Sequence, residues 1–408
     1  MSKHKFDDIN LNLCNFCGNC IAVCPTKAIE IGDEKPVLTG NCISCGLCYD
    51  NCPGIEVPFR KLENNIFGKN STSDIGVYKN IFISHSTDLN IRKNAASGGV
   101  VTSLLTYLFE EKNIDRAVVV GMNKNSPSEP EIKIVKSLSE LSSTSQSKYT
   151  MIPLNSILDK VKDAKGKTAI VGLPCHIHGI RKLQDSGWLR NDIITIGLFC
   201  GFNVSHKATE YLVKKLGFAK EDIKKIEYRA GKWPGGFRIE SKNGKKRYLP
   251  KEIYNFLMPM FVPKRCTVCP DLTGELADIS VGDAWIEGYK GWSSVITRTE
   301  MGDKIFKSAV KNGYLKAEKI SKEIILNTHS HLLRYKKRGI IIRMGNMKPL
   351  FDITFKSMSR SEWLKEVLLF LVIKISRSHL FRKIILSLPI VFIIKMSTWS
   401  KRFLKKGV

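Results

Sequence analysis

Eight of the twelve cysteines form two copies of one spacing, and this duplication restricts the fold of the chain more than any other feature. The pattern is Cys-x2-Cys-x2-Cys-x3-Cys-Pro. The first copy holds Cys14, Cys17, Cys20 and Cys24, and the second holds Cys42, Cys45, Cys48 and Cys52. Bacterial ferredoxins have this spacing, and the fourth cysteine of each run ligates the other cluster. The sequence therefore predicts two [4Fe–4S] clusters.

The same rule predicts how the eight thiolates divide. One cluster takes Cys14, Cys17, Cys20 and Cys52, and the other takes Cys42, Cys45, Cys48 and Cys24. Gly18 and Gly46 can supply the positive φ angles that such tight loops need. The alternatives are a zinc site, which usually takes two Cys-x2-Cys pairs, and a disulfide framework. Neither accounts for two runs of four cysteines at cluster spacing.

The ends of the chain differ in charge. Residues 1–70 have 7 Lys and Arg against 8 Asp and Glu, a net charge of −1. Residues 331–408 have 18 Lys and Arg against 3 Asp and Glu, a net charge of +15, which is more than half of the +27 of the whole chain. A nucleic-acid-binding chain would be more evenly basic, and we expect no nucleic acid partner. A basic tail favours an anionic membrane or an acidic protein, and the alternative is a solvated Lys-rich surface.

The N-terminus has no apolar secretory segment, so we expect a cytoplasmic protein whose thiols are reduced. Residues 54–79 have little periodicity and predict a linker. The next segment predicts a strand over 80–84, a loop, a helix from Val100 and a strand over 116–121, which favours a parallel pair of strands. Ser97 is the expected N-cap. Gly98 and Gly99 before a helix would let a phosphate approach the backbone, although a simple helix-start turn has the same pattern.

The other four cysteines lie in different surroundings. Cys175 and Cys200 each follow a predicted buried strand, over 167–173 and 193–199, and Cys266 and Cys269 form a pair before a proline. Ligands of open α/β sheets bind at the carboxyl ends of the strands. Spacing alone leaves three readings of these cysteines open: a third [4Fe–4S] cluster, a zinc site, and core packing or a lone nucleophile. We predict structural roles, and not metal binding, for His176 and His178.

Taken together, several motifs resemble the coenzyme F420 hydrogenase/dehydrogenase beta-subunit family over about residues 1–310, with a ferredoxin module in front. These motifs are Ala96–Gly99, Ser147–Tyr149, Gly172–Cys175, Ile196–Cys200, Arg265–Cys269 and Glu275–Asp283. The resemblance implies FAD beside an iron–sulfur cluster. It makes Ser97, Gly98, Gly99 and Lys148 candidate flavin contacts, and Cys175, Cys200, Cys266 and Cys269 the ligands of a third cluster. It also implies electron donors such as ferredoxin or a deazaflavin.

The sequence departs from the family pattern at two places, and both departures argue against a deazaflavin as the substrate. His176 stands where family members often have Gln, and residues 229–236 are more like the bacterial branch. Some bacterial relatives are associated with surface-polysaccharide synthesis.

The tail contains two strongly apolar runs, 364–374 and 384–395, the second interrupted by Pro389. Each is too short to span a bilayer. Flanking Lys and Arg residues, together with Trp363 and Trp399, favour a peripheral contact of residues 360–408 with the inner face of the cell membrane. The alternative is a pair of helices that pack on the core or on a partner subunit.

We therefore expect an α/β (mixed α+β) chain with four parts: a two-cluster ferredoxin-type domain over 1–70, the two parts of the core over 71–160 and 161–320, and a basic helical tail over 321–408. The predicted function is an iron–sulfur flavoprotein oxidoreductase that passes electrons through [4Fe–4S] clusters to FAD and on to an unidentified small-molecule acceptor. The alternatives are an electron-transfer subunit that is not catalytic alone and a structural metal protein.

Overall fold

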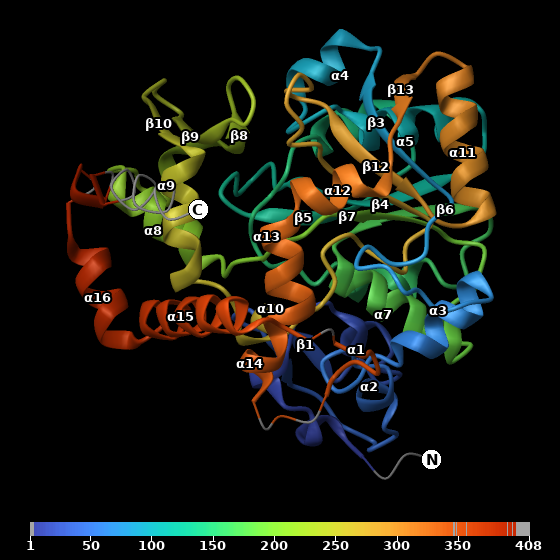
Figure 1. The fold of residues 1–408 in the computed structure, drawn as a ribbon, viewed down its shortest axis with the longest axis horizontal. Helices are drawn as coiled ribbons and strands as arrows, with labels where there is room; N and C mark the ends of the chain where they lie inside the picture. The colour runs from blue at the N-terminus through green and yellow to red at the C-terminus, as the bar shows by residue number, and fades with distance from the viewer. Residues whose placement is uncertain are drawn as a thin grey trace.

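The computed structural model describes residues 4–345, 347, 349–355, 357–389, 391–393 and 395–396. In Figure 1 the cysteine-rich module lies at the bottom, the large sheet above it, and a smaller lobe with the tail helices to the left. The mixed α/β class predicted from the sequence is confirmed, because helices accompany an eight-stranded, a three-stranded and a two-stranded sheet.

The N-terminal module consists of short elements joined by the cysteine loops. They are η1 (Phe6–Asp8), η2 (Leu11–Leu13), α1 (Asn19–Ala22), β1 (Ile29–Ile31), β2 (Pro36–Leu38) and α2 (Leu47–Asp50). Gly18 and Gly46 precede the two α-helices with φ of +96° and +78°, so each cysteine run turns through a left-handed glycine into a helix. A Cβ at Gly18 would also lie 2.4 Å from the Ser156 nitrogen, so this loop contacts the core closely.

The predicted linker over 54–79 is wrong in part, because it contains the helix α3 (Phe59–Phe67). Phe59 and Leu62 are buried in the core that the module shares with the large sheet. Four apolar positions in nine residues gave too weak a pattern to predict this helix, and tertiary packing stabilises it.

Eight strands form the large sheet in the order β13-β3-β12-β11-β7-β6-β4-β5. Their bounds are β3 (Asn80–Ser86), β4 (Arg116–Met122), β5 (Pro130–Val135), β6 (Thr168–Gly172), β7 (Ile194–Leu198), β11 (Ile279–Asp283), β12 (Ser293–Thr297) and β13 (Leu315–Lys319). The four central strands β4, β6, β7 and β11 are parallel. The expected pairing of the strands at 80 and 116 is wrong, because β12, β11, β7 and β6 lie between them. A local β–loop–α–β pattern carries no information about strands that enter the sheet later.

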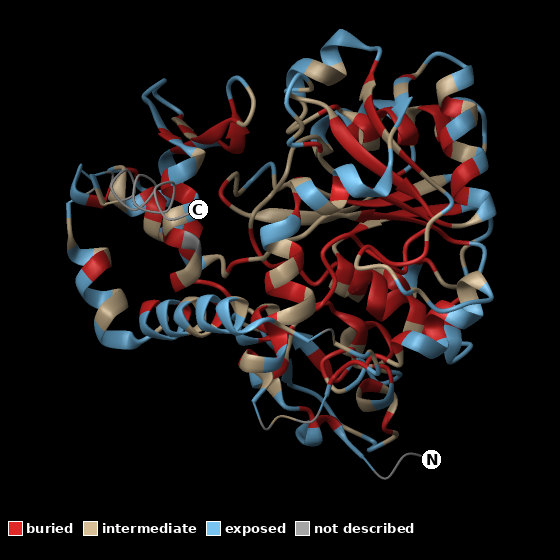
Figure 2. Ribbon diagram, in the orientation of Figure 1, coloured by how far each residue is buried: buried red, intermediate tan, exposed pale blue. Residues whose placement is uncertain are grey.

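Helices cover both faces of this sheet. The shorter elements are α4 (Leu89–Asn94), α6 (Leu138–Leu141), η3 (Ser142–Thr144) and η4 (Leu154–Lys160), and the longer helices are α5 (Val100–Glu110), α7 (Pro174–Asp185) and α11 (Glu300–Lys311). Val119 faces the core with α5 and α11, whereas its neighbour Val118 faces the core with α7 and the cysteine module. The sheet is therefore buried on both faces, as Figure 2 shows.

A second, three-stranded sheet forms the smaller lobe, in the order β10-β9-β8. The lobe contains α8 (Lys207–Lys215), η5 (Lys220–Asp222), β8 (Ile223–Ala230), β9 (Gly236–Ser241), β10 (Lys246–Pro250), α9 (Lys251–Leu257) and η6 (Met258–Met260). α10 (Lys264–Thr267) then returns the chain toward the module.

The tail begins with a series of short helices that pack on the core. These are α12 (Lys322–Thr328), α13 (Ser330–Leu333), the π-helical turn η7 (Arg334–Arg338) and α14 (Ile340–Met344), followed by α15 (Arg360–Ser376) and α16 (His379–Ser387). Within the described residues, no helix is both long and apolar enough to cross a bilayer. Trp399, which the sequence analysis placed at a membrane surface, lies outside the described residues.

Candidate iron–sulfur centres

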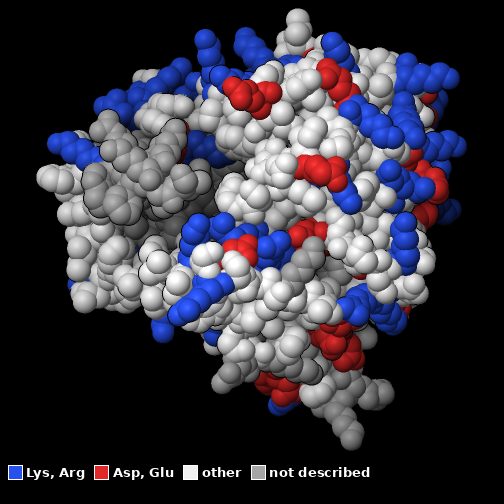
Figure 3. Space-filling model, viewed as in Figure 1, with Lys and Arg blue, Asp and Glu red and all other residues white. Residues whose placement is uncertain are grey.

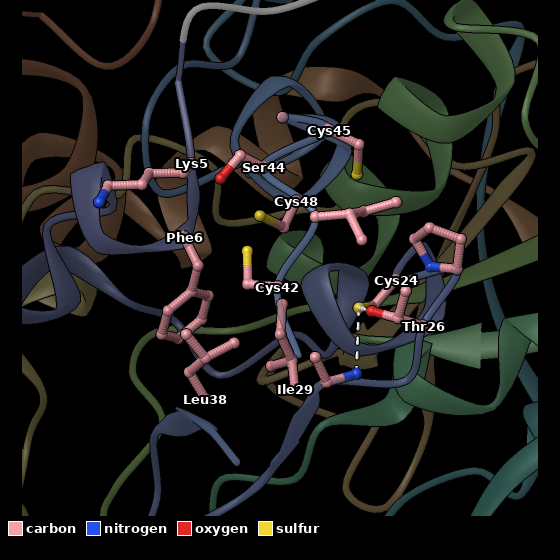
Figure 4. A pocket seen from close by; sticks show the side chains of 14 residues that line it. Lys5, Phe6, Cys24, Thr26, Ile29, Leu38, Cys42, Ser44, Cys45 and Cys48 are labelled. Atoms are coloured by element: carbon pink, nitrogen blue, oxygen red, sulfur yellow. Dashed lines mark hydrogen bonds between the residues drawn. The ribbon is translucent and has the colours of Figure 1, made fainter. Parts of the chain in front are cut away.

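The structure divides the eight N-terminal cysteines between two hollows of the module. Cys24, Cys42, Cys45 and Cys48 line the outer hollow (Figure 4), and Cys14, Cys17, Cys20 and Cys52 line the inner hollow. Each hollow thus takes three cysteines of one run and the fourth cysteine of the other run. We call these groups the outer set and the inner set.

The donor chemistry of both sets fits a [4Fe–4S] cluster. Backbone N–H groups point at ligand sulfurs: Phe16 N donates to Cys14 Sγ, Ala28 N to Cys24 Sγ and Gly54 N to Cys52 Sγ, each at 3.3 Å. Such hydrogen bonds favour a thiolate and help to set the potential of a cluster. Among the described residues, no group of three or more His, Cys, Asp or Glu side chains converges on a single ion. A cube needs its thiolates around a hollow, because each one binds a different iron.

Burial makes these thiols hard to ionise before a cation binds. It raises the pKa of Cys14 to about 11, and the thiol of Cys52 contributes to this shift. It raises the pKa of Cys48 to about 12, and the thiol of Cys45 contributes there. Because the thiolate is the metal ligand, cluster binding must release these protons and supply the compensating positive charge.

The remaining four cysteines also come together, although they are spread over 95 residues of sequence. Cys175 lies in the first turn of α7, directly after β6, and Cys200 follows the parallel neighbour β7. Cys200 N donates to Leu272 O at 2.8 Å, which holds this strand end beside the loop that follows Cys269. Burial raises the pKa of Cys175, and the thiols of Cys200, Cys266 and Cys269 raise it further. We call these four cysteines the core set.

The three sets lie in a row. Cys48 of the outer set is near enough to Cys20 of the inner set to raise its pKa. Cys17 of the inner set has the same effect on Cys175 of the core set. The row therefore runs from the outer set through the inner set to the core set at the edge of the sheet.

The two histidines beside Cys175 are buried structural residues on α7. His176 Nδ1 accepts from Leu173 N at 3.1 Å, and its Nε2 donates to Ile152 O at 3.1 Å. Burial lowers the pKa of His176 to about 4, so the ring is neutral. His178 Nε2 lies 2.9 Å from Asp271 Oδ2, which ties α7 to the loop after Cys269. The predicted structural roles agree with these contacts, although both histidines lie on a helix inside the protein.

The glycine loop before α5 is arranged differently from the expectation. Gly99, with φ of +76°, is the N-cap, whereas Ser97 Oγ donates to Trp292 O at 2.6 Å. Ser97 is therefore not the N-cap, because its hydroxyl anchors the loop to the strand end before β12. Gly98 N donates to Ser293 Oγ at 3.0 Å, and a Cβ on Gly98 would lie 2.5 Å from Ser84 O.

Lys148 is half-buried, and its Nζ donates to three carbonyl oxygens, those of Thr144, Ser145 and Gln146, at 2.6, 2.7 and 3.0 Å. Burial, with a contribution from Lys133, lowers the pKa of Lys148 to about 7. Its ammonium therefore braces its own loop in this structure.

Sequence reasoning missed the residue that joins these two segments. Arg229 donates to Ala96 O at 2.7 Å and to Tyr149 Oη at 3.1 Å, and it pairs with Asp283 at 3.0 Å. It thereby brings the Ser97–Gly99 loop beside the Ser147–Tyr149 segment. A single arginine in a β-strand gives no signal of such a role.

Two models of the family "Coenzyme F420 hydrogenase/dehydrogenase, beta subunit" match, the N-terminal one over residues 81–159 and the C-terminal one over residues 165–323. A "4Fe-4S dicluster domain" matches residues 7–53. The beta subunit of coenzyme F420 hydrogenase from Methanothermobacter thermautotrophicus is 33% identical over 254 residues, which are 60% of this chain and 86% of that one.

Two further matches extend this result. The coenzyme F420-dependent sulfite reductase of Methanocaldococcus jannaschii is 29% identical over 330 residues, 76% of this chain, but the match spans only 48% of that longer protein. Among solved structures, a chain of the F420-reducing [NiFe] hydrogenase complex from Methanosarcina barkeri matches with a TM-score of 0.54 and 25% identity, over 65% of this chain and 92% of that one.

Proposed function

The chain belongs to the coenzyme F420 hydrogenase/dehydrogenase beta-subunit family, and on this basis we propose that it is an iron–sulfur electron-transfer subunit of a multi-subunit oxidoreductase. The observation that carries the proposal is the row of three cysteine sets, from the surface module to the edge of the core sheet. When bound, [4Fe–4S] clusters supply one-electron storage and transfer. The chain's own contribution is to hold twelve thiols in three neighbouring groups.

This proposal is the alternative of the sequence analysis, and it is better supported than a self-contained reductase. The matched relative and the matched structure are named as a subunit and as part of a complex, which favours a protein partner. The surface-polysaccharide acceptor has no support in the fold or in the comparisons.

FAD remains part of the proposal. Its candidate contacts, Ser97, Gly98, Gly99 and Lys148, lie on two segments that Arg229 joins. The start of α5 after the left-handed Gly99 suits a phosphate, whereas Gly98 is buried and its N–H already donates to Ser293 Oγ. When bound, a flavin exchanges electrons singly or as a hydride, and this chemistry would couple the core set to a deazaflavin.

The test uses the full chain, purified without air. We expect about twelve iron atoms, from three four-iron clusters, and one flavin per chain. Reduced coenzyme F420 should bleach the visible spectrum without any partner protein, whereas sustained turnover should require a partner. Zinc in place of iron, or a spectrum that neither reduced coenzyme F420 nor reduced ferredoxin changes, would contradict the proposal. Repeated turnover of a small acceptor by the chain alone would favour the self-contained enzyme.

We also propose that the tail contacts an anionic membrane surface. Leu364, Leu368, Leu371 and Ile375 recur at helical spacing along α15 and are 51, 63, 43 and 53% exposed. In Figure 3 the area of α15 and α16 at the lower left has few charged side chains, with Lys and Arg at its edges. An apolar helix face bordered by basic residues suits the headgroup region of a bilayer.

Replacing Leu368 and Leu371 by glutamine should abolish most co-flotation of the protein with vesicles that contain anionic lipid. The reason is that two exposed leucines lose the acyl contact, worth about 1.5–3 kcal/mol each on full burial. The matched control is Ile341→Gln, which changes an apolar side chain, 45% exposed, outside this helix face. Equal flotation of the wild type and the double variant would contradict the membrane contact.

A further inference from the structure

The tail places a buried lysine beside the core set. Lys336 lies in the π-helical turn η7 and is only 2% exposed. Lysine is almost never fully buried without a partner, because its charge must leave water. Its Nζ donates to Asp271 O at 2.8 Å, and in the described part of the chain it forms no ion pair with a carboxylate. A carbonyl dipole alone compensates poorly for a buried ammonium.

The thiols of the core set face Lys336, and they would become negative groups as the thiolate ligands of a cluster. Lys336 Nζ and Cys269 Sγ donate to the same carbonyl oxygen, Asp271 O, at 2.8 and 3.7 Å, so the ammonium lies directly beside a thiol of the core set. Although burial lowers it, the pKa of Lys336 is raised because Cys269, Cys200, Cys266 and Asp271 lie near the ammonium. The Asp271 carboxylate already has other partners: Gly274 N and Glu275 N donate to it at 2.7 and 3.0 Å, and His178 lies at 2.9 Å. The three thiols are therefore the partners left for the lysine.

Two residues that follow Lys336 fasten this part of the tail to the segment that carries Cys266 and Cys269. Lys337 Nζ lies 2.6 Å from Glu275 Oε1, and Arg343 Nε donates to Thr267 O at 2.7 Å. Leu332, just before the turn, packs near Gly201, the residue after Cys200. This segment lies beyond residue 323, where the family match ends, so the lysine is delivered by a part of the chain outside that match.

We propose that Lys336 is a positioning residue for redox potential: its buried ammonium stabilises the reduced form of a [4Fe–4S] cluster held by Cys175, Cys200, Cys266 and Cys269. The proposal rests on the third cluster of the proposed function. Reduction adds one electron, with no bond formed or broken. A fixed positive charge in a poorly solvated site favours the more negative state, and solvent screens it little.

The effect should be specific to the core set. Lys336 faces Cys200 and Cys266 of the core set, whereas Arg265, a second buried cation, faces both the inner and the core set through Cys14, Cys52 and Cys266. Lys336 would therefore raise the potential of the core cluster relative to the other two, and the core end of the row would attract the electron.

The test is an anaerobic potentiometric titration of the full chain followed by EPR, with iron counted in each variant. In Lys336→Met we expect the equilibrium constant for reducing the core cluster to fall about tenfold or more, which is about 59 mV for a one-electron couple. The potentials of the other two clusters should not change. Lys336→Arg keeps the charge and should keep the potential. Lys322→Met removes an exposed charge from the same tail, where solvent screens it, and is the matched control.

Each outcome decides a different point. Lys336→Met with twelve iron atoms and an unchanged core potential would overturn the role of Lys336 alone. Loss of four iron atoms in Lys336→Met but not in Lys336→Arg would overturn the role in setting the potential, because the positive charge would then be needed to hold the cluster. Loss in both variants would overturn it in favour of packing. A wild type with only about eight iron atoms would overturn the third cluster itself, and this inference with it.

Discussion

Replacing Cys200 by alanine is expected to lower the iron content of the anaerobically purified chain from about twelve to about eight atoms. Three cysteines would remain in the core set, and we expect them to lose the cube because one iron would have no protein ligand. The EPR signals of the two module clusters should persist, because Cys200 lines neither of their hollows. Iron analysis and EPR of the dithionite-reduced protein make the measurement.

The comparison variant for this experiment is Cys52→Ala, which should lose the same amount of iron from a different set. The two variants should therefore have equal iron content and different EPR spectra. Twelve iron atoms in Cys200→Ala would contradict the assignment of the core set, and identical spectra for both variants would contradict the division of the ligands.

Cys52→Ala should also abolish electron delivery from the outer set to the core. The inner set lies in the middle of the row, between Cys48 on one side and Cys175 on the other, so its loss interrupts the route. The measurement is stopped-flow reduction of the chain by reduced ferredoxin, followed at the absorbance of the core centre.

The matched variant here is Cys42→Ala, which removes the outer cluster and leaves the inner one. If electrons enter at the outer set, both variants fail; if they enter at the inner set, only Cys52→Ala fails. A full rate of core reduction in Cys52→Ala, despite the loss of about four iron atoms, would show that the row is not the electron route.

The cysteine spacing predicted the module because each run is local: three ligands and a left-handed glycine fit within seven residues. The structure groups the thiols of Cys24 and Cys52 as the ferredoxin rule expects, each with the other run. The resemblance to the beta-subunit family is confirmed by the matches over residues 81–159 and 165–323. Both predictions drew on motifs whose residues are close in sequence.

What the sequence could not reveal depends on long-range packing. Ser97 has the right chemistry for an N-cap, yet a carbonyl 195 residues away takes its hydroxyl. The strands β3 and β4 are consecutive in their local unit, but four later strands separate them. Lys336 is one of several lysines in a basic tail, and only the folded chain distinguishes it from the solvated ones.

The close contact between the cysteine module and the core has a kinetic consequence. Asn19 donates to Asn51 O within the module and to Gly179 O on α7, and Asn155 donates to Asn19 Oδ1. These buried amides, together with the close contact between Gly18 and Ser156, fix the position of the module relative to the core. Internal electron hops should consequently be independent of solvent viscosity, so a dependence of the overall rate on viscosity would report the encounter with an external carrier.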